Sequence, residues 1–167
     1  DTKLGHKVNN VTEQEVLQNA LDNLCTWSDR WCMEFNVKKC KVMHLGKKNK
    51  EYAYYMKGSI LSSVNRERDI GVLVESSLKP SLHCAEASRK ASVVLGQITR
   101  AFQYRDRITF LKLYVQFVRC HLEFASPVWS PWHIGGIEIL EKVQRHAVNF
   151  MTGLKGVIYE DKLKELG

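Results

Sequence analysis

Six lysines gather in one short stretch of the first half of the chain. They are Lys38, Lys39, Lys41, Lys47, Lys48 and Lys50. A lysine that binds a nucleic-acid phosphate releases condensed counterions, which favours association, and aromatic rings such as those of Tyr52, Tyr54 and Tyr55 can stack on bases. The same composition is also typical of a solvated, lysine-rich hairpin that protects an edge strand from aggregation. The cluster therefore predicts a phosphate-binding patch, and the solvated hairpin is its alternative.

The charge of the whole chain is compatible with either interpretation. Its 167 residues carry 25 Lys and Arg against 18 Asp and Glu, a net charge of +7 with a pI near 9.2. This excess is moderate and is spread over both halves, so charge alone does not decide whether the chain meets nucleic acid.

Other chemistry is weakly represented in the sequence. The pairs Cys40 and His44, His83 and Cys84, and Cys120 and His121 lack the doubled short spacing of structural zinc sites. No GxSxG elbow, P-loop or GxGxxG string is present. We therefore expect neither a zinc site nor a nucleophilic triad. Cys25 and Cys32 are expected as small core residues. The four tryptophans, at 27, 31, 129 and 132, are expected in the core or at an interface.

Cysteine usage and hydropathy bear on location. The five cysteines are odd in number and have no CxxC spacing. This pattern disfavours a disulfide scaffold and indicates a reducing compartment, so we expect an intracellular protein of the nucleus or cytoplasm. No run approaches the roughly 18 apolar residues that a membrane span needs, so no membrane partner is expected.

The first half of the chain predicts one helix and several short strands. Apolar residues recur at three- and four-residue steps over residues 12–33, which predicts an amphipathic helix. Thr12 and Glu15 have the spacing of a capping box at its start. Alternating and aromatic-rich stretches then predict short strands. These stretches are residues 41–45, 52–56, 60–64 and 69–74.

The second half changes to a helical period. We expect a long helix from Ser81 to about Phe102. Asp106 is a suitable cap for a second helix over 107–124, and Gly153 is a plausible stop for a third over 137–151. A last short helix is expected after Tyr159. The order predicts an α+β fold, with a helix and a small antiparallel sheet in residues 1–78 and a helical bundle in residues 79–167.

Several strings, taken in order, resemble the motifs of one enzyme family. They are DTKL at residues 1–4, NVKKC at 36–40, DIGV at 69–72, RCHLEFA at 119–125, WSPW at 129–132, LEKVQR at 140–145 and YEDKL at 159–163. Together they resemble the reverse transcriptases of LINE-type (jockey-like) non-LTR retrotransposons.

Each string resembles one part of these enzymes. DTKL resembles the end of the aromatic-x-Asp-Asp box, NVKKC the next palm motif, Asn-Pro-x-Lys-Thr, and DIGV the hairpin that grips the primer end. The four strings of the helical half are similar to the thumb. Val37, Cys40 and Ile70 depart from the usual proline, threonine and leucine.

The resemblance implies a fold and a set of roles. Residues 1–78 would be a late palm with a primer-grip-like hairpin, and residues 79–167 a thumb. Asp1 would be a catalytic ligand of Mg²⁺ in the intact enzyme, and Lys39 would lie near the nucleotide phosphates, where an ammonium can neutralise a leaving pyrophosphate. Gly71 would let the hairpin approach the primer closely. The implied partners are an RNA template and a DNA primer, contacted by Lys38, Lys41, Lys47 and Lys48 and by Arg89, Lys90 and Arg100. For the last three residues, a solvated helix face is the alternative.

The resemblance also implies what the full-length enzyme needs before Asp1: the fingers, the first catalytic aspartate and the rest of the palm. Two-metal chemistry requires carboxylates from at least two segments, and Mg²⁺ requires ordered, near-octahedral ligands. We therefore expect the isolated chain not to polymerise DNA. Two alternatives remain open, a non-enzymatic nucleic-acid-binding or interaction module and a relic without a selected role.

Overall fold

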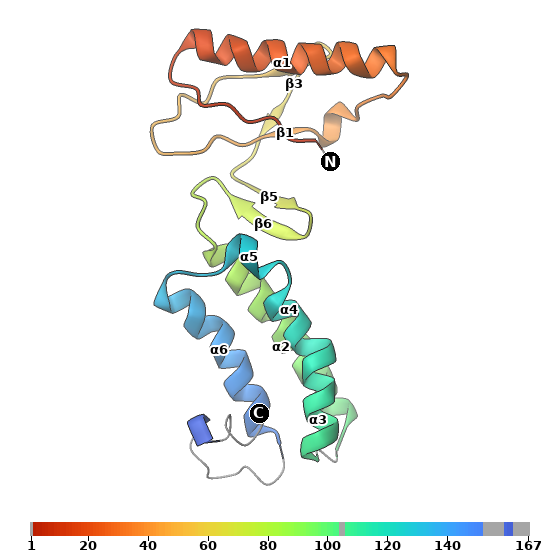
Figure 1. Ribbon diagram of the computed structural model, residues 1–167, viewed down its shortest axis with the longest axis vertical. Helices are drawn as coiled ribbons and strands as arrows, with labels where there is room; N and C mark the ends of the chain where they lie inside the picture. Colours follow the sequence, from red (N-terminus) through yellow and green to blue (C-terminus); the bar gives the residue numbers. More distant parts are fainter. Residues whose placement is uncertain (1, 104–105, 152–158, 162–167) are drawn as a thin grey trace. The chain divides into compact units, whose positions relative to one another are not determined.

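The computed structural model describes residues 2–103, 106–151 and 159–161. This part combines helices with short strands, which confirms the α+β class. The chain forms two compact units (Figure 1). The N-terminal unit comprises residues 1–67 and 75–78, and the C-terminal unit comprises residues 68–74 and 79–167. Most of the hairpin around Gly71, residues 68–74, therefore belongs to the C-terminal unit, although the residues just before it belong to the N-terminal unit.

Helix α1, Val11–Arg30, is the long element of the N-terminal unit. It begins one residue before the expected start, because Asn10 caps it: the Asn10 Oδ1 accepts a hydrogen bond from the Glu13 N–H at 2.8 Å. The Glu13 carboxylate reaches back to the Asn9 N–H. The predicted box of Thr12 and Glu15 was therefore wrong by two residues. The helix also ends three residues earlier than expected, where the chain turns through Cys32 at φ 52°.

The strands of this unit are short and pair over long distances. After the 3₁₀ turn Val37–Lys39 come β1, Lys41–Val42; β2, Tyr55–Met56; β3, Ser59–Ile60; and β4, Ser62–Ser63. Strands β2 and β3 form an antiparallel hairpin. Strand β1 pairs with β4 in parallel, with Lys41 opposite Ser62. The expected single antiparallel sheet is therefore replaced by separate two-stranded pairs, one of them parallel.

A small core joins α1 to these strands. Tyr54, Met56 and Leu61 are buried, and Leu17, Leu21 and Leu24 of α1 pack against them. The Gln18 side chain adds two hydrogen bonds to the Tyr55 backbone, at 2.8 and 2.9 Å. These bonds give hydrogen-bond partners to the N–H and the carbonyl of Tyr55, in a strand of only two residues.

The C-terminal unit is built from helices that pack around a larger and a smaller hydrophobic cluster. They are α2, Ser81–Ala101; α3, Arg107–Leu113; a π-helical segment, Tyr114–Arg119; α4, Cys120–Glu123; α5, Ser126–Trp129; and α6, Ile134–Asn149. Asp106 caps α3 as expected, since its Oδ2 accepts from the Thr109 N–H at 2.9 Å. The helix expected over 107–124 thus exists but contains a π segment. The expected stop at Gly153 lies outside the described residues, and of the last expected helix the structure describes residues 159–161, which are helical.

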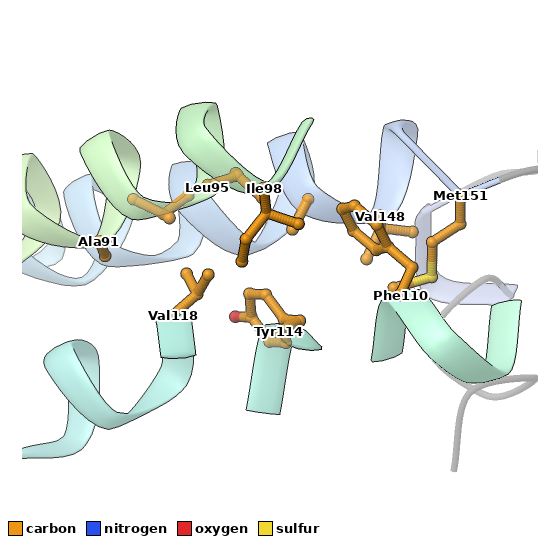
Figure 2. Close-up of a cluster of buried hydrophobic side chains, with 10 residues drawn as sticks. Ala91, Leu95, Ile98, Phe110, Tyr114, Val118, Val148 and Met151 are labelled. Atoms are coloured by element: carbon orange, nitrogen blue, oxygen red, sulfur yellow. The ribbon is translucent and has the colours of Figure 1, made fainter. Parts of the chain in front are cut away.

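Figure 2 shows the core between α2, the α3–α4 segment and α6. Phe110, Tyr114 and Val118 recur every four residues and are buried against Leu95 of α2 and Val148 of α6. Burial raises the pKa of the Tyr114 hydroxyl above its ordinary value. This cluster is the larger hydrophobic core of the unit, and it fixes the helix on which Arg89 and Lys90 lie.

The tryptophans and two cysteines expected in the core or at an interface differ in burial. Trp129 is buried, but Trp27, Trp31 and Trp132 are exposed, with Trp31 at 62%. Cys25 is half-buried beside Leu24, whereas Cys32, expected in the core, is exposed. Helical periodicity identifies the faces of a helix but not whether a neighbouring element covers the ends of the apolar face, so it did not show that Cys32 lies in solvent.

Candidate nucleic-acid interface

The lysines of the predicted patch surround β1. Lys38 and Lys39 lie in the 3₁₀ turn, Lys41 on β1, and Lys47 and Lys48 in the turn after Gly46; all are exposed. The Lys41 ammonium donates to the Ser62 hydroxyl at 2.9 Å, across the parallel strand pair. Among the described residues, none of these lysines forms an ion pair with a carboxylate. The ammonium groups of these exposed lysines therefore face solvent and are not neutralised by a neighbouring carboxylate of the described residues.

A groove lies beside the 3₁₀ turn. It has a volume of about 400 Å³ and is lined by Phe35, Asn36, Val37, Lys38, Ser59, Ile60 and Ser62. Lys38 is the single charged side chain in this lining, and the two serine hydroxyls and the asparagine amide are its other polar groups. Such a surface offers hydrogen-bond donors to an anion. The NVKKC string is thus placed at a concave, electropositive surface.

The hairpin with Gly71 joins β5, Arg66–Asp69, to β6, Val72–Glu75. Its turn residues Ile70 and Gly71 both have positive φ, 44° and 88°, which is the geometry of a tight two-residue hairpin turn. Glycine suits it, but a β-branched side chain is strained there. The Ile70 side chain is 73% exposed. The tip of the hairpin therefore presents a strained apolar residue to solvent.

Substitutions at the two turn positions are expected to have opposite effects. Gly71→Ala should lower the free energy of unfolding by about 1–2 kcal/mol, because an L side chain is disfavoured at this φ. An added Cβ would also lie 2.9 Å from the Phe124 ring. Ile70→Asn should raise the free energy of unfolding by about 1 kcal/mol, since asparagine tolerates this region. Urea unfolding of both variants measures this, and changes of the same sign would contradict the strained turn.

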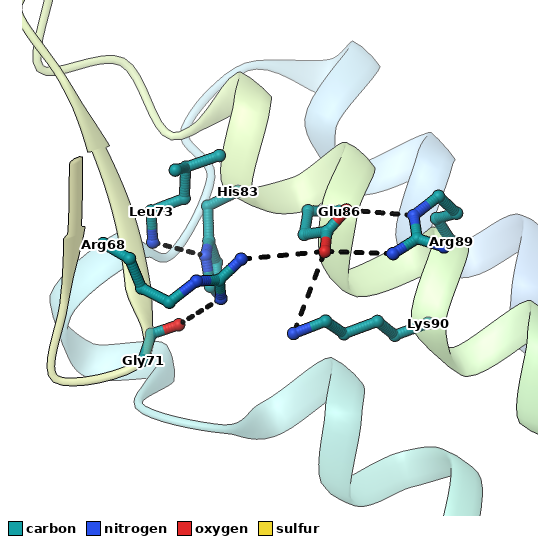
Figure 3. Close-up of polar contacts among 7 residues, drawn as sticks. All are labelled: Arg68, Gly71, Leu73, His83, Glu86, Arg89 and Lys90. Carbon is teal, nitrogen blue, oxygen red and sulfur yellow. Dashed lines mark hydrogen bonds and ion pairs between the residues drawn. The ribbon is translucent and has the colours of Figure 1, made fainter. Parts of the chain in front are cut away.

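His83 on α2 ties the hairpin to the helix. Its Nδ1 accepts a hydrogen bond from the Leu73 N–H at 3.0 Å, and its ring lies 4.6 Å from that of Trp129 (Figure 3 shows the hydrogen bond). His83 is 5% exposed. Burial lowers the pKa of its imidazole below the ordinary value, and the nearby charges of Arg68 and Lys90 lower it further. His83 was predicted only as a poor metal ligand, and its role in positioning the hairpin was not predicted.

Three cations surround the Glu86 carboxylate of α2, and the four side chains are called the Glu86 group: Glu86, Arg89 and Lys90 of α2 and Arg68 of β5. Glu86 lies 3.0 Å from Arg89, 3.7 Å from Arg68 and 3.8 Å from Lys90 (Figure 3). The hydrogen bonds from Arg89 are the largest cause of the lowered pKa of Glu86. Arg89 and Lys90 were predicted as phosphate contacts; Arg68 and Glu86 were not. The signal for Glu86 was its spacing of three and four residues from the two cations.

The predicted site residues fall into two groups. The lysines belong to the N-terminal unit, whereas Gly71, Arg89, Lys90 and Arg100 belong to the C-terminal unit. Arg100 lies in the last turn of α2 and is exposed, and it follows Glu86 by 14 residues of the same helix. Asp1, which the resemblance implies as a metal ligand, lies outside the residues that the structure describes.

Magnesium would need several oxygen ligands in one place. Within residues 2–103, 106–151 and 159–161, no group of three His, Cys, Asp or Glu side chains is arranged to hold a metal ion. Asp1, the ligand that the resemblance implies, lies outside these residues, and no step below depends on the ion. In the same part of the chain, no helix has the length and hydropathy needed to cross a membrane.

Comparison of the chain with protein-family models, with curated proteins and with solved structures found no match.

Proposed function

We propose that this chain is the late-palm and thumb part of an RNA-directed DNA polymerase of a LINE-type non-LTR retrotransposon, and that it binds the RNA template and DNA primer through their phosphates. The proposal joins two separate lines of support. The order of the sequence strings supports the family. The exposed lysines around β1 support binding to a polyanion.

One observation carries the binding proposal: the lysines around β1 have no carboxylate partner among the described residues. A solvated hairpin that only guards an edge needs no such concentration of uncompensated charge. Uncompensated charge repels itself and favours a polyanionic partner, whose condensed counterions are released on binding. The groove beside Lys38 adds neutral donors that can orient a phosphate.

Within this proposal the roles are divided. Lys39 acts near the nucleotide phosphates as a cation and proton donor, and Asp1 is the metal ligand of the intact enzyme. Lys38, Lys41, Lys47 and Lys48 hold the nucleic-acid backbone. Contacts to the backbone position the duplex without reading its sequence, so we expect binding with little sequence preference.

The paired substitution of Lys47→Gln and Lys48→Gln tests this function. The slope of log affinity against log salt should become shallower by about 0.9 for each lysine that contacts a phosphate of duplex DNA. Fluorescence anisotropy with a labelled 20-base-pair duplex at several salt concentrations measures the slope. Lys112→Gln with Lys142→Gln is the matched control, because it removes two exposed charges from the C-terminal unit. Equal slopes for both pairs, or no salt dependence in the wild type, would refute the lysine patch.

A second candidate, a non-enzymatic interaction module, is favoured by the exposed apolar residues of α1. Val16, Trp27 and Trp31 lie on this helix or at its end and are each about half exposed or more. Exposed apolar groups of this size mark protein-binding surfaces when they are contiguous. Binding of an environment-sensitive hydrophobic dye, together with a flat salt curve for DNA, would favour this candidate over the first.

A further inference from the structure

The C-terminal unit contains a cavity that is lined by residues of the π-helical segment, α4 and α6. Its volume is about 420 Å³, which is within the range of small-molecule sites. Apolar side chains form one part of its wall, among them Leu122, Ile137 and Leu140. An apolar wall with a few converging polar groups is typical of a ligand site, so the polar groups of this cavity indicate which ligand it can hold.

The Tyr114 hydroxyl opens into this cavity. Tyr114 belongs to the larger core and is only 8% exposed. In the part of the chain that the structure describes, its hydroxyl has no hydrogen-bond partner, and no polar side-chain atom there is both sealed from solvent and unpaired. The hydroxyl therefore reaches solvent, and it does so through the cavity that Tyr114 lines. It is left to bond to whatever enters the cavity.

The charges around this hydroxyl are mainly negative. The charged residues of the lining are Arg119, Glu123 and Glu141, so the cavity carries an excess of negative charge in a chain whose net charge is +7. Burial is the first cause of the raised pKa of Tyr114; Arg119 then lowers this pKa, and the two glutamates raise it. All three charges therefore lie close enough to the hydroxyl to act on it.

Each of the two carboxylates is held through one oxygen. The Glu123 Oε1 accepts a hydrogen bond from the Arg119 Nε at 2.6 Å. The Glu141 Oε1 accepts from the Tyr159 hydroxyl at 2.9 Å. Among the described residues, neither Oε2 atom has a hydrogen-bond donor. The two Oε2 atoms and the Tyr114 hydroxyl are therefore three oxygen acceptors, supplied by three different elements.

We propose that this cavity binds a small organic ammonium ion. The three N–H donors of the ammonium match the three oxygen acceptors, and hydrogen bonds between an ammonium and a carboxylate are stronger than neutral ones. The apolar body of the ligand lies against the apolar wall. A divalent metal ion needs more oxygen ligands than these, and an anion would meet two carboxylates. The site is independent of the proposed function, because no nucleic acid enters the argument.

Titration with three probes of similar shape tests the preference for a cation. The probes are 2-phenylethylammonium, 2-phenylethanol and 3-phenylpropionate, added to the full 167-residue chain at neutral pH. NMR of the Leu122, Ile137 and Leu140 methyl groups should show saturable ring-current shifts, with an affinity for the ammonium about 5-fold or more above that for the alcohol. No shift at these methyl groups, or equal affinity for the alcohol or the anion, would overturn the proposal.

Glu141→Gln tests the carboxylate. The amide removes the charge but keeps an oxygen that can accept from Tyr159, and we expect the affinity for 2-phenylethylammonium to fall about 10-fold, as for a lost hydrogen bond to a charged group. Glu138→Gln is the matched control, because Glu138 is exposed on the same helix and lies outside the lining. Equal losses for the two variants would show a general charge effect and contradict the site.

Tyr114→Phe keeps the test available if Glu141→Gln does not fold. It removes only the hydroxyl, so the affinity for 2-phenylethylammonium should fall about 5-fold. Because the hydroxyl has no partner among the described residues, the midpoint of urea unfolding should stay unchanged. An unchanged affinity would reject the role of Tyr114 in the site. A lower unfolding midpoint would also reject it, since the hydroxyl would then already be bonded within the protein.

Discussion

Replacing Phe110 by alanine is expected to lower the free energy of unfolding of the C-terminal unit by about 3–5 kcal/mol, the range for aromatic truncation in a packed core. Phe110 is 1% exposed and lies in the cluster that joins α2, the α3–α4 segment and α6. Its removal would leave a cavity that helices capped and fixed on both sides cannot close. Urea unfolding, followed by hydrogen exchange of the α2 amides, measures the loss in this unit alone.

Phe117→Ala is the matched control for Phe110→Ala. Phe117 lies in the same helical segment but is 51% exposed, so its truncation removes little buried area. We expect a change of less than about 1 kcal/mol, as for most surface substitutions. Equal losses for the two variants would mean that the π-helical segment faces the core differently from the structure described here.

Acidification is expected to destabilise the C-terminal unit through His83. Its folded-state pKa lies below the ordinary value of 6.5, first because of burial and then because of Arg68 and Lys90, with Glu86 acting in the opposite direction. Between those two pKa values the unfolded chain takes up a proton that the folded protein does not. Stability is therefore complete above pH 6.5, falls as the pH drops towards the folded-state pKa, and levels off below it.

The hydrogen bond to Leu73 explains why this proton matters. A protonated imidazole has no acceptor nitrogen, so the Leu73 N–H would lose its partner, and an unsatisfied buried donor costs about 1–3 kcal/mol. Thermal unfolding between pH 7.5 and 5 should show a steeper loss for the wild type than for His83→Asn, which offers an amide oxygen and does not titrate. His121→Asn is the control; if it removes the same slope, the assignment to His83 is wrong.

The helices were predictable because their signals are local. Apolar spacing identified α1, α2 and α6 to within a few residues, and the Asp106 cap was identified from its position alone. Where two polar residues compete to cap, as Asn10 and Thr12 do, the spacing does not decide between them. The geometry of the backbone decides, and Asn10 has the extended φ and ψ that a cap requires.

The strand pairing and the Glu86 group were not predictable in the same way. The β1–β4 pair brings together Lys41 and Ser62, which are far apart in the chain and carry no turn signal between them that indicates parallel pairing. Arg68 reaches Glu86 only because the hairpin packs Val72 against Cys84 and Trp129. Both arrangements depend on tertiary packing, which a pattern within one element cannot express.

The π-helical segment Tyr114–Arg119 has a consequence for how this helix can change length. Phe110, Tyr114 and Val118 are spaced four residues apart and all face one core. In an ordinary α-helix, residues at this spacing turn gradually away from one face, and the wider turns of the π segment offset that rotation. Loss of one residue within the segment would restore regular winding and turn everything beyond it by about 100°. A single-residue deletion there would thus rotate the Arg119 and Glu123 side chains about the helix axis while leaving α3 in place. The π segment therefore determines which way the side chains of α4 face.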